Sequence, residues 1–227
     1  MEHLLDNPAW NALNSGNSNL SNGNELVKYF SPEVSPFVAL RESTPDNFEL
    51  MHRLLPFEIP VLYVTARQID IPDLWKQLHC VRAFQMVYND AQQSIPDSGA
   101  KLIPLNDKHI PQMLALTKLT NPGPFVDRTI EFGHYQGIFD GDELVAMAGQ
   151  RLHIGNYAEI SAVCTHPDHT GKGYARQLLL SQVKRILAAN ETPFLHVRRD
   201  NDRAVKVYHD MGFQTRSEMY FYVLRKN

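Results

Sequence analysis

The chain has 227 residues, of which 43% are hydrophobic and 21% charged, a composition typical of globular proteins rather than disordered or collagen-like ones. Its 22 lysines and arginines against 25 acidic residues give a net charge of −3. This balance offers no excess positive charge, so we expect neither nucleic acid nor a membrane surface as a partner. At roughly 100–200 residues per domain, the length allows one large domain or two small ones.

Three features predict a reducing compartment. The two cysteines, Cys80 and Cys164, are too few for a disulfide framework. Residues 1–6 lack the basic and apolar regions of a signal peptide. No stretch approaches the roughly 18 consecutive apolar residues of a membrane helix. We therefore expect a cytoplasmic protein.

The first part of the chain predicts a small α+β domain. An exposed loop rich in Asn, Ser and Gly is expected over residues 11–24, then strands over 37–40 and 61–65 on either side of a helix over 46–55. Residues 71–75 favour the start of a short helix, and residues 81–87 a strand. Polar residues with Pro96 and Gly99 then indicate a linker. We expect an N-terminal domain over 1–92, a linker over 93–100 and a second domain over 101–227.

The second part shows clearer periodicity. We expect strands over 101–105, 134–139, 143–152, 158–165, 194–197 and 218–224, and helices over 107–120, 127–132, 171–189 and 202–210. Asp140-Gly141-Asp142 is a strong hairpin signal, and Gly212 is a natural helix stop. The order of these elements predicts an α+β fold, a mixed sheet flanked by helices.

One strand-to-helix junction carries candidate chemistry. Thr170-Gly171-Lys172-Gly173-Tyr174-Ala175 opens the helix expected at 171–189. Glycines at a helix start leave backbone N–H groups that can bind phosphate, although a tight turn without a ligand has the same pattern. The segment is neither a Walker A loop nor the Rossmann fingerprint, because the required residues after the glycines are missing.

A second motif follows the next strand. Asn201 stands at the strand end, Tyr208 lies about two helical turns later on the same face, and Gly212-Phe213 follow. With the glycine loop and the strand over 159–165, residues 101–227 resemble the GNAT superfamily of acetyl-coenzyme A-dependent N-acetyltransferases. An N-terminal extension before such a unit is similar to the glycine N-acyltransferase-like branch, whose first half is often a degenerate copy of the same fold.

This resemblance implies a GNAT acyl-CoA N-acyltransferase fold that binds acetyl-coenzyme A without a metal. Backbone N–H groups of the loop would hold the pyrophosphate, the strand before it would pair with the pantetheine arm, and Asn201 would bind a pantetheine amide. The family usually has Gln or Arg where this chain has Thr170, so one side-chain contact is lost or moved. The implied cofactor-binding residues are Val163, Cys164, Thr165, Thr170, Gly171, Lys172, Gly173, Tyr174, Ala175, Arg176 and Asn201.

The resemblance also implies a direct transfer of the acetyl group to an amine. Glu159 would be the general base and Tyr208 the general acid that protonates the departing thiolate. Alternatively, Glu159 is an outward-facing strand carboxylate without a catalytic role. A chain of water molecules would then accept the proton of the amine. His166 and His169 read as turn histidines rather than metal ligands. The expected acceptor is a small molecule or an amino acid rather than a protein, and the alternative function is a non-catalytic module that senses acyl-CoA.

Overall fold

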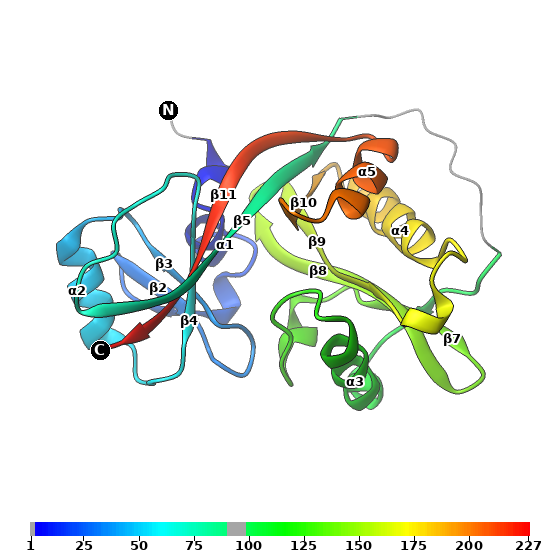
Figure 1. Ribbon diagram of the computed structural model, residues 1–227, viewed down its shortest axis with the longest axis horizontal. Helices are drawn as coiled ribbons and strands as arrows, with labels where there is room; N and C mark the ends of the chain where they lie inside the picture. Colours follow the sequence, from blue (N-terminus) through cyan, green and yellow to red (C-terminus); the bar gives the residue numbers. More distant parts are fainter. Residues whose placement is uncertain (1–2, 90–98) are drawn as a thin grey trace.

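In the computed structural model, which describes residues 3–89 and 99–227, the strands form one mixed sheet of 11 strands in the order β1-β2-β3-β4-β11-β5-β10-β9-β8-β7-β6 (Figure 1). The predicted α+β fold class, a mixed sheet flanked by helices, is confirmed. Within the described residues, no helix is long and apolar enough to cross a membrane.

The elements of the first part lie mostly where the sequence predicts them. The helix expected over 46–55 begins after Thr44, whose side chain accepts a hydrogen bond from the backbone N–H of Asn47. The segment 11–24 is more ordered than an exposed loop, because Asn17 is buried and accepts from the backbone N–H of His153. The elements are α1 (Pro8–Leu13), β1 (Ser21–Gly23), β2 (Val27–Phe30), β3 (Phe37–Leu40), α2 (Pro45–Leu54), β4 (Val61–Thr65) and β5 (Trp75–Tyr88), with short 3₁₀ helices at Leu4–Asp6 and Ser18–Leu20.

The elements of the second part follow the predicted order. They are β6 (Ile103–Pro104), α3 (Ile110–Thr120), β7 (Gln136–Asp140), β8 (Glu143–Ile154), β9 (Tyr157–Thr165), α4 (Tyr174–Ala188), β10 (Thr192–Arg198), α5 (Asp202–Asp210) and β11 (Phe213–Lys226), with 3₁₀ helices at Asp107–His109, Thr129–Phe132 and Pro167–His169. Side chains of β8 alternate between the two faces of the sheet. Met147 packs with Met113 of α3, whereas Ala146 and Ala148 pack with Leu178 of α4. The two helices therefore cover opposite faces.

Strand β5 corrects two expectations. The segment 71–75 does not open a helix, because β5 begins at Trp75 and continues as one strand to Tyr88. This strand pairs antiparallel with both β10 and β11. The C-terminal strand is also longer than expected, and it pairs with β4 and β5 of the first part. Each part of the chain is thus completed by strands of the other.

The division into two domains stays a prediction. Residues 93–98 of the expected linker lie outside the described residues. Strand β5, from the expected first domain, lies between β10 and β11 of the second in one continuous sheet. If the chain is divided into these two domains, they are joined by the pairing of β5 with β10 and β11.

Candidate functional site

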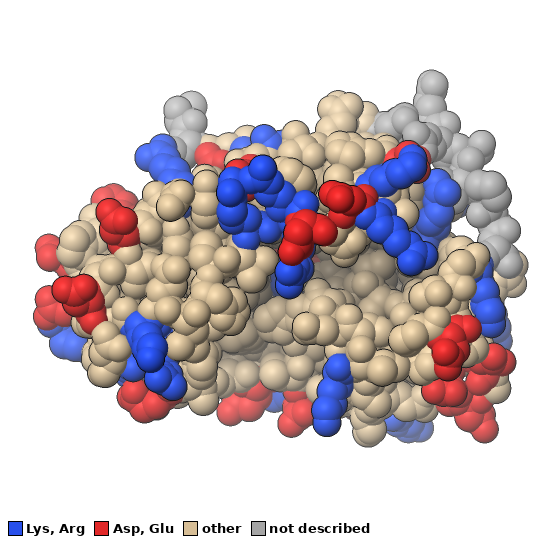
Figure 2. Space-filling view, in the orientation of Figure 1, with Lys and Arg blue, Asp and Glu red and all other residues tan. Residues whose placement is uncertain are grey.

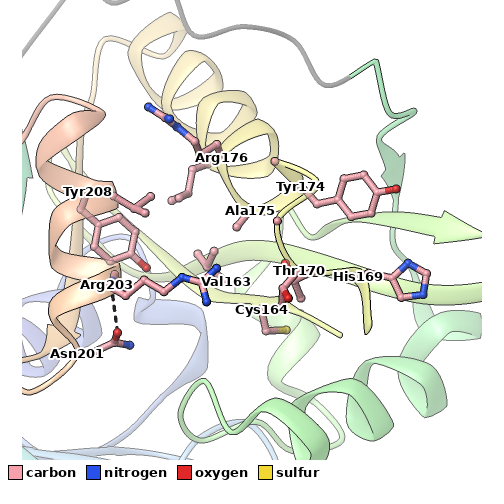
Figure 3. A pocket seen from close by; sticks show the side chains of 16 residues that line it. Val163, Cys164, His169, Thr170, Tyr174, Ala175, Arg176, Asn201, Arg203 and Tyr208 are labelled. Atoms are coloured by element: carbon pink, nitrogen blue, oxygen red, sulfur yellow. Dashed lines mark hydrogen bonds between the residues drawn. The ribbon is translucent and has the colours of Figure 1, made fainter. Parts of the chain in front are cut away.

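A cavity of about 420 Å³ lies where β9 and β10 separate. The two strands pair in parallel only between Tyr157–Glu159 and Thr192–Phe194. In Figure 3, side chains from β9, the start of α4 and α5 surround one space, and Figure 2 shows this side of the molecule hollowed, with lysine and arginine side chains along one rim. The lining residues are Val163, Cys164, Thr165, His169, Thr170, Gly171, Gly173, Tyr174, Ala175, Arg176, Leu179, Asn201, Arg203, Ala204, Val207 and Tyr208.

The cavity brings together every predicted site residue except Glu159 and Lys172. Lys172 is exposed, and its Nζ lies 3.2 Å from His169 Nδ1 and 6.0 Å from the Tyr174 ring centre. Arg203 also lines the cavity, although it is not among the predicted site residues. Its position follows from the helix that starts at Asp202.

The glycine loop has the backbone of an anion site. Gly171 and Gly173 adopt φ angles of 81° and 79°, which favour glycine. Gly173 is the N-cap of α4, and no side chain caps this helix start. The first N–H groups of α4 thus lack a side-chain acceptor at the cavity edge, where the helix dipole is positive. Arg176 of α4 and Arg203 of α5 also line the cavity and add two positive charges.

A bulge in β9 shapes the wall opposite α5. Cys164 pairs with Met147 and Ser161 with Gly149, so two β9 residues oppose one residue of β8. Within the bulge, Ala162 adopts a φ of 53°, which is uncommon for a residue with a Cβ atom. Burial raises the pKa of the Cys164 thiol to about 11, so this thiol stays protonated at neutral pH.

Asn201 and Tyr208 come to the cavity on α5. The Asn201 Oδ1 accepts a hydrogen bond of 3.1 Å from the Ala204 backbone N–H and so caps the helix. Loss of solvent raises the pKa of Tyr208 to about 12. The phenol is therefore a proton donor at neutral pH, and its ring packs edge-on against Phe213 with centroids 6.1 Å apart.

Glu159 does not fit the predicted role of general base. The residue is 0% exposed and lies outside the cavity that Asn201 and Tyr208 line. Its carboxylate accepts hydrogen bonds from Arg151 and from the Leu152 backbone N–H, and lies 2.7 Å from His196 Nδ1. Burial alone would raise the pKa of Glu159, but Arg151 and His196 outweigh this effect and lower it to about 2. Such a carboxylate has little affinity for a proton from an amine.

Sequence reasoning missed Arg151, the partner of Glu159. A signal was present, because an arginine within the apolar strand expected at 143–152 needs a buried counter-charge. Arg151 lines a second cavity of about 430 Å³, to which both parts of the chain contribute. Its lining residues are Leu62, His79, Val81, Ala83, Asn121, Pro122, Gly123, Pro124, Arg151, His196, Val197, Arg198, Phe221 and Val223.

Comparisons with known proteins agree with this architecture. The family model described as FR47-like protein matches residues 135–222. A solved structure from Novosphingobium aromaticivorans, described as a GNAT-family acetyltransferase, is 29% identical over 100% of both chains, with a TM-score of 0.90. The chain has the GNAT acyltransferase fold. Comparison with curated proteins finds no match.

More distant structures show the same GNAT fold. A GCN5-related N-acetyltransferase from Kribbella flavida is 12% identical, with a TM-score of 0.63 over 95% of each chain. A GNAT-family acetyltransferase from Colwellia psychrerythraea is 13% identical, with a TM-score of 0.54 over 88% of this chain and 80% of its own. Together with the family-model match, the Novosphingobium structure supports the GNAT superfamily and an acyltransferase. The two-part glycine N-acyltransferase-like branch stays a prediction.

Proposed function

We propose that this protein is an N-acetyltransferase that transfers an acetyl group from acetyl-coenzyme A to the amine of a small molecule. The observation that carries the proposal is the single cavity in which the uncapped start of α4, Asn201 and Tyr208 meet. These are the features needed to hold a pyrophosphate, to bind an amide and to protonate a thiolate.

The cavity residues fit coenzyme A. Backbone N–H groups after Gly171 would bind the pyrophosphate, with Arg176 and Arg203 near the phosphates. The Thr165 Oγ1 is buried and has no hydrogen-bond partner within the described residues. An unpaired buried hydroxyl on a cavity wall fits a ligand with polar groups, such as the amides of the pantetheine arm. Asn201 Nδ2 is also available, because the helix cap uses only Oδ1.

In the proposed reaction the amine nitrogen attacks the thioester carbonyl carbon and the carbon–sulfur bond breaks. Tyr208 gives its proton to the departing sulfur, and the proton that the nitrogen loses passes to water in the open cavity, which restores the phenol. Backbone N–H groups at the β9 bulge, at Val163 or Cys164, would stabilise the carbonyl oxygen as negative charge develops. Glu159 takes no direct part in this scheme, because its carboxylate is buried and ion-paired.

The proposal is tested by two measurements on the purified protein. Thermal shift with acetyl-coenzyme A is expected to show stabilisation, and a panel of amines and amino acids is expected to release coenzyme A. Absence of both responses would reject the enzyme. A thermal shift without coenzyme A release from any acceptor would favour the acyl-CoA-sensing module instead.

A further inference from the structure

Arg151 lies at the junction of two hollows beside the β9 bulge. It lies near the end of β8, its side chain is 12% exposed, and it lines the 430 Å³ cavity. It also lines a smaller hollow together with Ser161 and Ala162. These two residues directly precede Val163, which lines the 420 Å³ cavity proposed for acetyl-coenzyme A. A ligand held by Arg151 would therefore lie close to the place proposed for acyl transfer.

The Arg151 guanidinium is held rigidly along one edge. Its Nε and Nη2 donate to the two oxygens of Glu159 at 2.9 and 2.5 Å, and its carbon Cζ lies 5.0 Å from the Phe37 ring centre. His196 Nδ1 lies 2.7 Å from Glu159 Oε1 and fixes the carboxylate from the other side. Within the described residues, Nη1 makes no hydrogen bond. A guanidinium has five donors, so a second carboxylate can bind the remaining edge.

The 430 Å³ cavity has a charge pattern that selects among amines. Its titratable side chains are all basic, and no Asp or Glu among the described residues lines it. A polyamine would therefore find no counter-charge there. The remaining wall is largely apolar and fits a hydrocarbon body. Its apolar side chains are those of Leu62, Val81, Ala83, Val197, Phe221 and Val223.

We propose that the acceptor is an amino acid with an apolar side chain, and that the Nη1 edge of Arg151 binds its carboxylate. This inference rests on the proposed acetyltransferase function. Glu159 and His196 are positioning residues in this scheme, because they orient Arg151 without touching the acceptor. The apolar side chain would pack on the sheet face that β5 and β11 form at this cavity, so both parts of the chain build the acceptor site.

The test compares ligand pairs that differ only in the carboxylate. L-phenylalanine and 2-phenylethylamine form one pair, and L-leucine and 3-methylbutylamine form another, with spermidine as the polycation. Binding to the protein saturated with coenzyme A is measured by calorimetry, and coenzyme A release is measured with acetyl-coenzyme A. We expect each amino acid to bind about 10- to 100-fold more tightly than its amine, the range for hydrogen bonds to charged groups.

The Arg151→Gln variant is expected to lose this preference, with amino-acid affinity lowered about 10- to 100-fold and amine affinity nearly unchanged. The Arg151→Lys variant should keep part of the preference for amino acids that Arg151→Gln loses. Glu159→Gln should raise KM for the amino acid more than it lowers kcat. The matched control Arg53→Gln removes an exposed arginine of α2 and should change none of these values.

Two outcomes would overturn the assignment. In the first, the wild-type protein binds the amino acids no more tightly than the matching amines, a result that needs no variant. The other is an equal loss of affinity for acid and amine in a folded Arg151→Gln protein. Amino-acid binding without any coenzyme A release would instead reject the acetyltransferase function and leave the carboxylate site standing.

Discussion

The Gln85 amide on β5 lies 3.0 Å from His196 Nε2 on β10, and this contact joins the two parts of the chain across the sheet. Gln85 is 0% exposed. Its Nε2 donates to the Leu5 carbonyl at 2.9 Å, and its Oε1 accepts from Arg216 Nε at 2.6 Å. A buried polar row therefore runs from Arg151 through Glu159 and His196 to the first residues of the chain.

Replacing Gln85 by leucine should lower the free energy of unfolding by about 2–3 kcal/mol, because it leaves buried hydrogen-bonding groups without partners. Urea unfolding measures this loss. Gln68→Leu, at an exposed position, should change stability by less than about 0.5 kcal/mol. Equal stability of the two variants would show that the hydrogen bonds of Gln85 contribute nothing to stability.

Tyr208→Phe should lower kcat by about 10²- to 10⁴-fold, the usual contribution of general acid catalysis, while acetyl-coenzyme A still binds. Steady-state kinetics and thermal shift separate the two effects. Because the pKa of Tyr208 is about 12, the wild-type rate should not fall between pH 7 and 10 through loss of this proton. An unchanged kcat in the variant would remove Tyr208 from the acid role.

Gly171→Ala should weaken acetyl-coenzyme A binding, because a Cβ atom strains a residue with a φ of 81° and shifts the loop. Gly141→Ala is the matched control. Gly141 also has a positive φ, of 58°, and neither glycine has an atom within 4 Å of an added Cβ. Both variants should lose about 1–2 kcal/mol of stability, and only Gly171→Ala should lose affinity in calorimetry. Equal affinities would argue against the loop as the pyrophosphate site.

Acid should destabilise the protein partly through Glu159. Its pKa is lowered from 4.5 to about 2, so the folded state favours the charged form. The resulting stability is present above pH 4.5 and is lost as the pH falls from 4.5 toward 2. Urea unfolding across this range should show a steeper loss for the wild type than for Glu159→Gln. Parallel pH curves would mean that the ion pair with Arg151 is not maintained in solution.

Local signals explain the elements that the sequence predicted well. The helix expected over 202–210 is α5, because Asn201 caps its start and Gly212, with a φ of 91°, follows its end. The sequence predicts too short a strand here, because Pro72 and Asp73 resemble a helix start, whereas pairing with β11 extends the strand to Trp75. Such pairing depends on residues far along the chain.

The sequence by itself predicted most of the residues that line the cavity of about 420 Å³, because the glycine turn, Asn201 and Tyr208 each depend on backbone conformation and helical spacing within a few residues. Only the tertiary structure decided what Glu159 does. Its side chain meets Arg151 of β8 and His196 of β10, and β10 in turn pairs with β5 from the first part of the chain. The pKa of a carboxylate follows from such neighbours and its burial, which spacing along a strand does not specify.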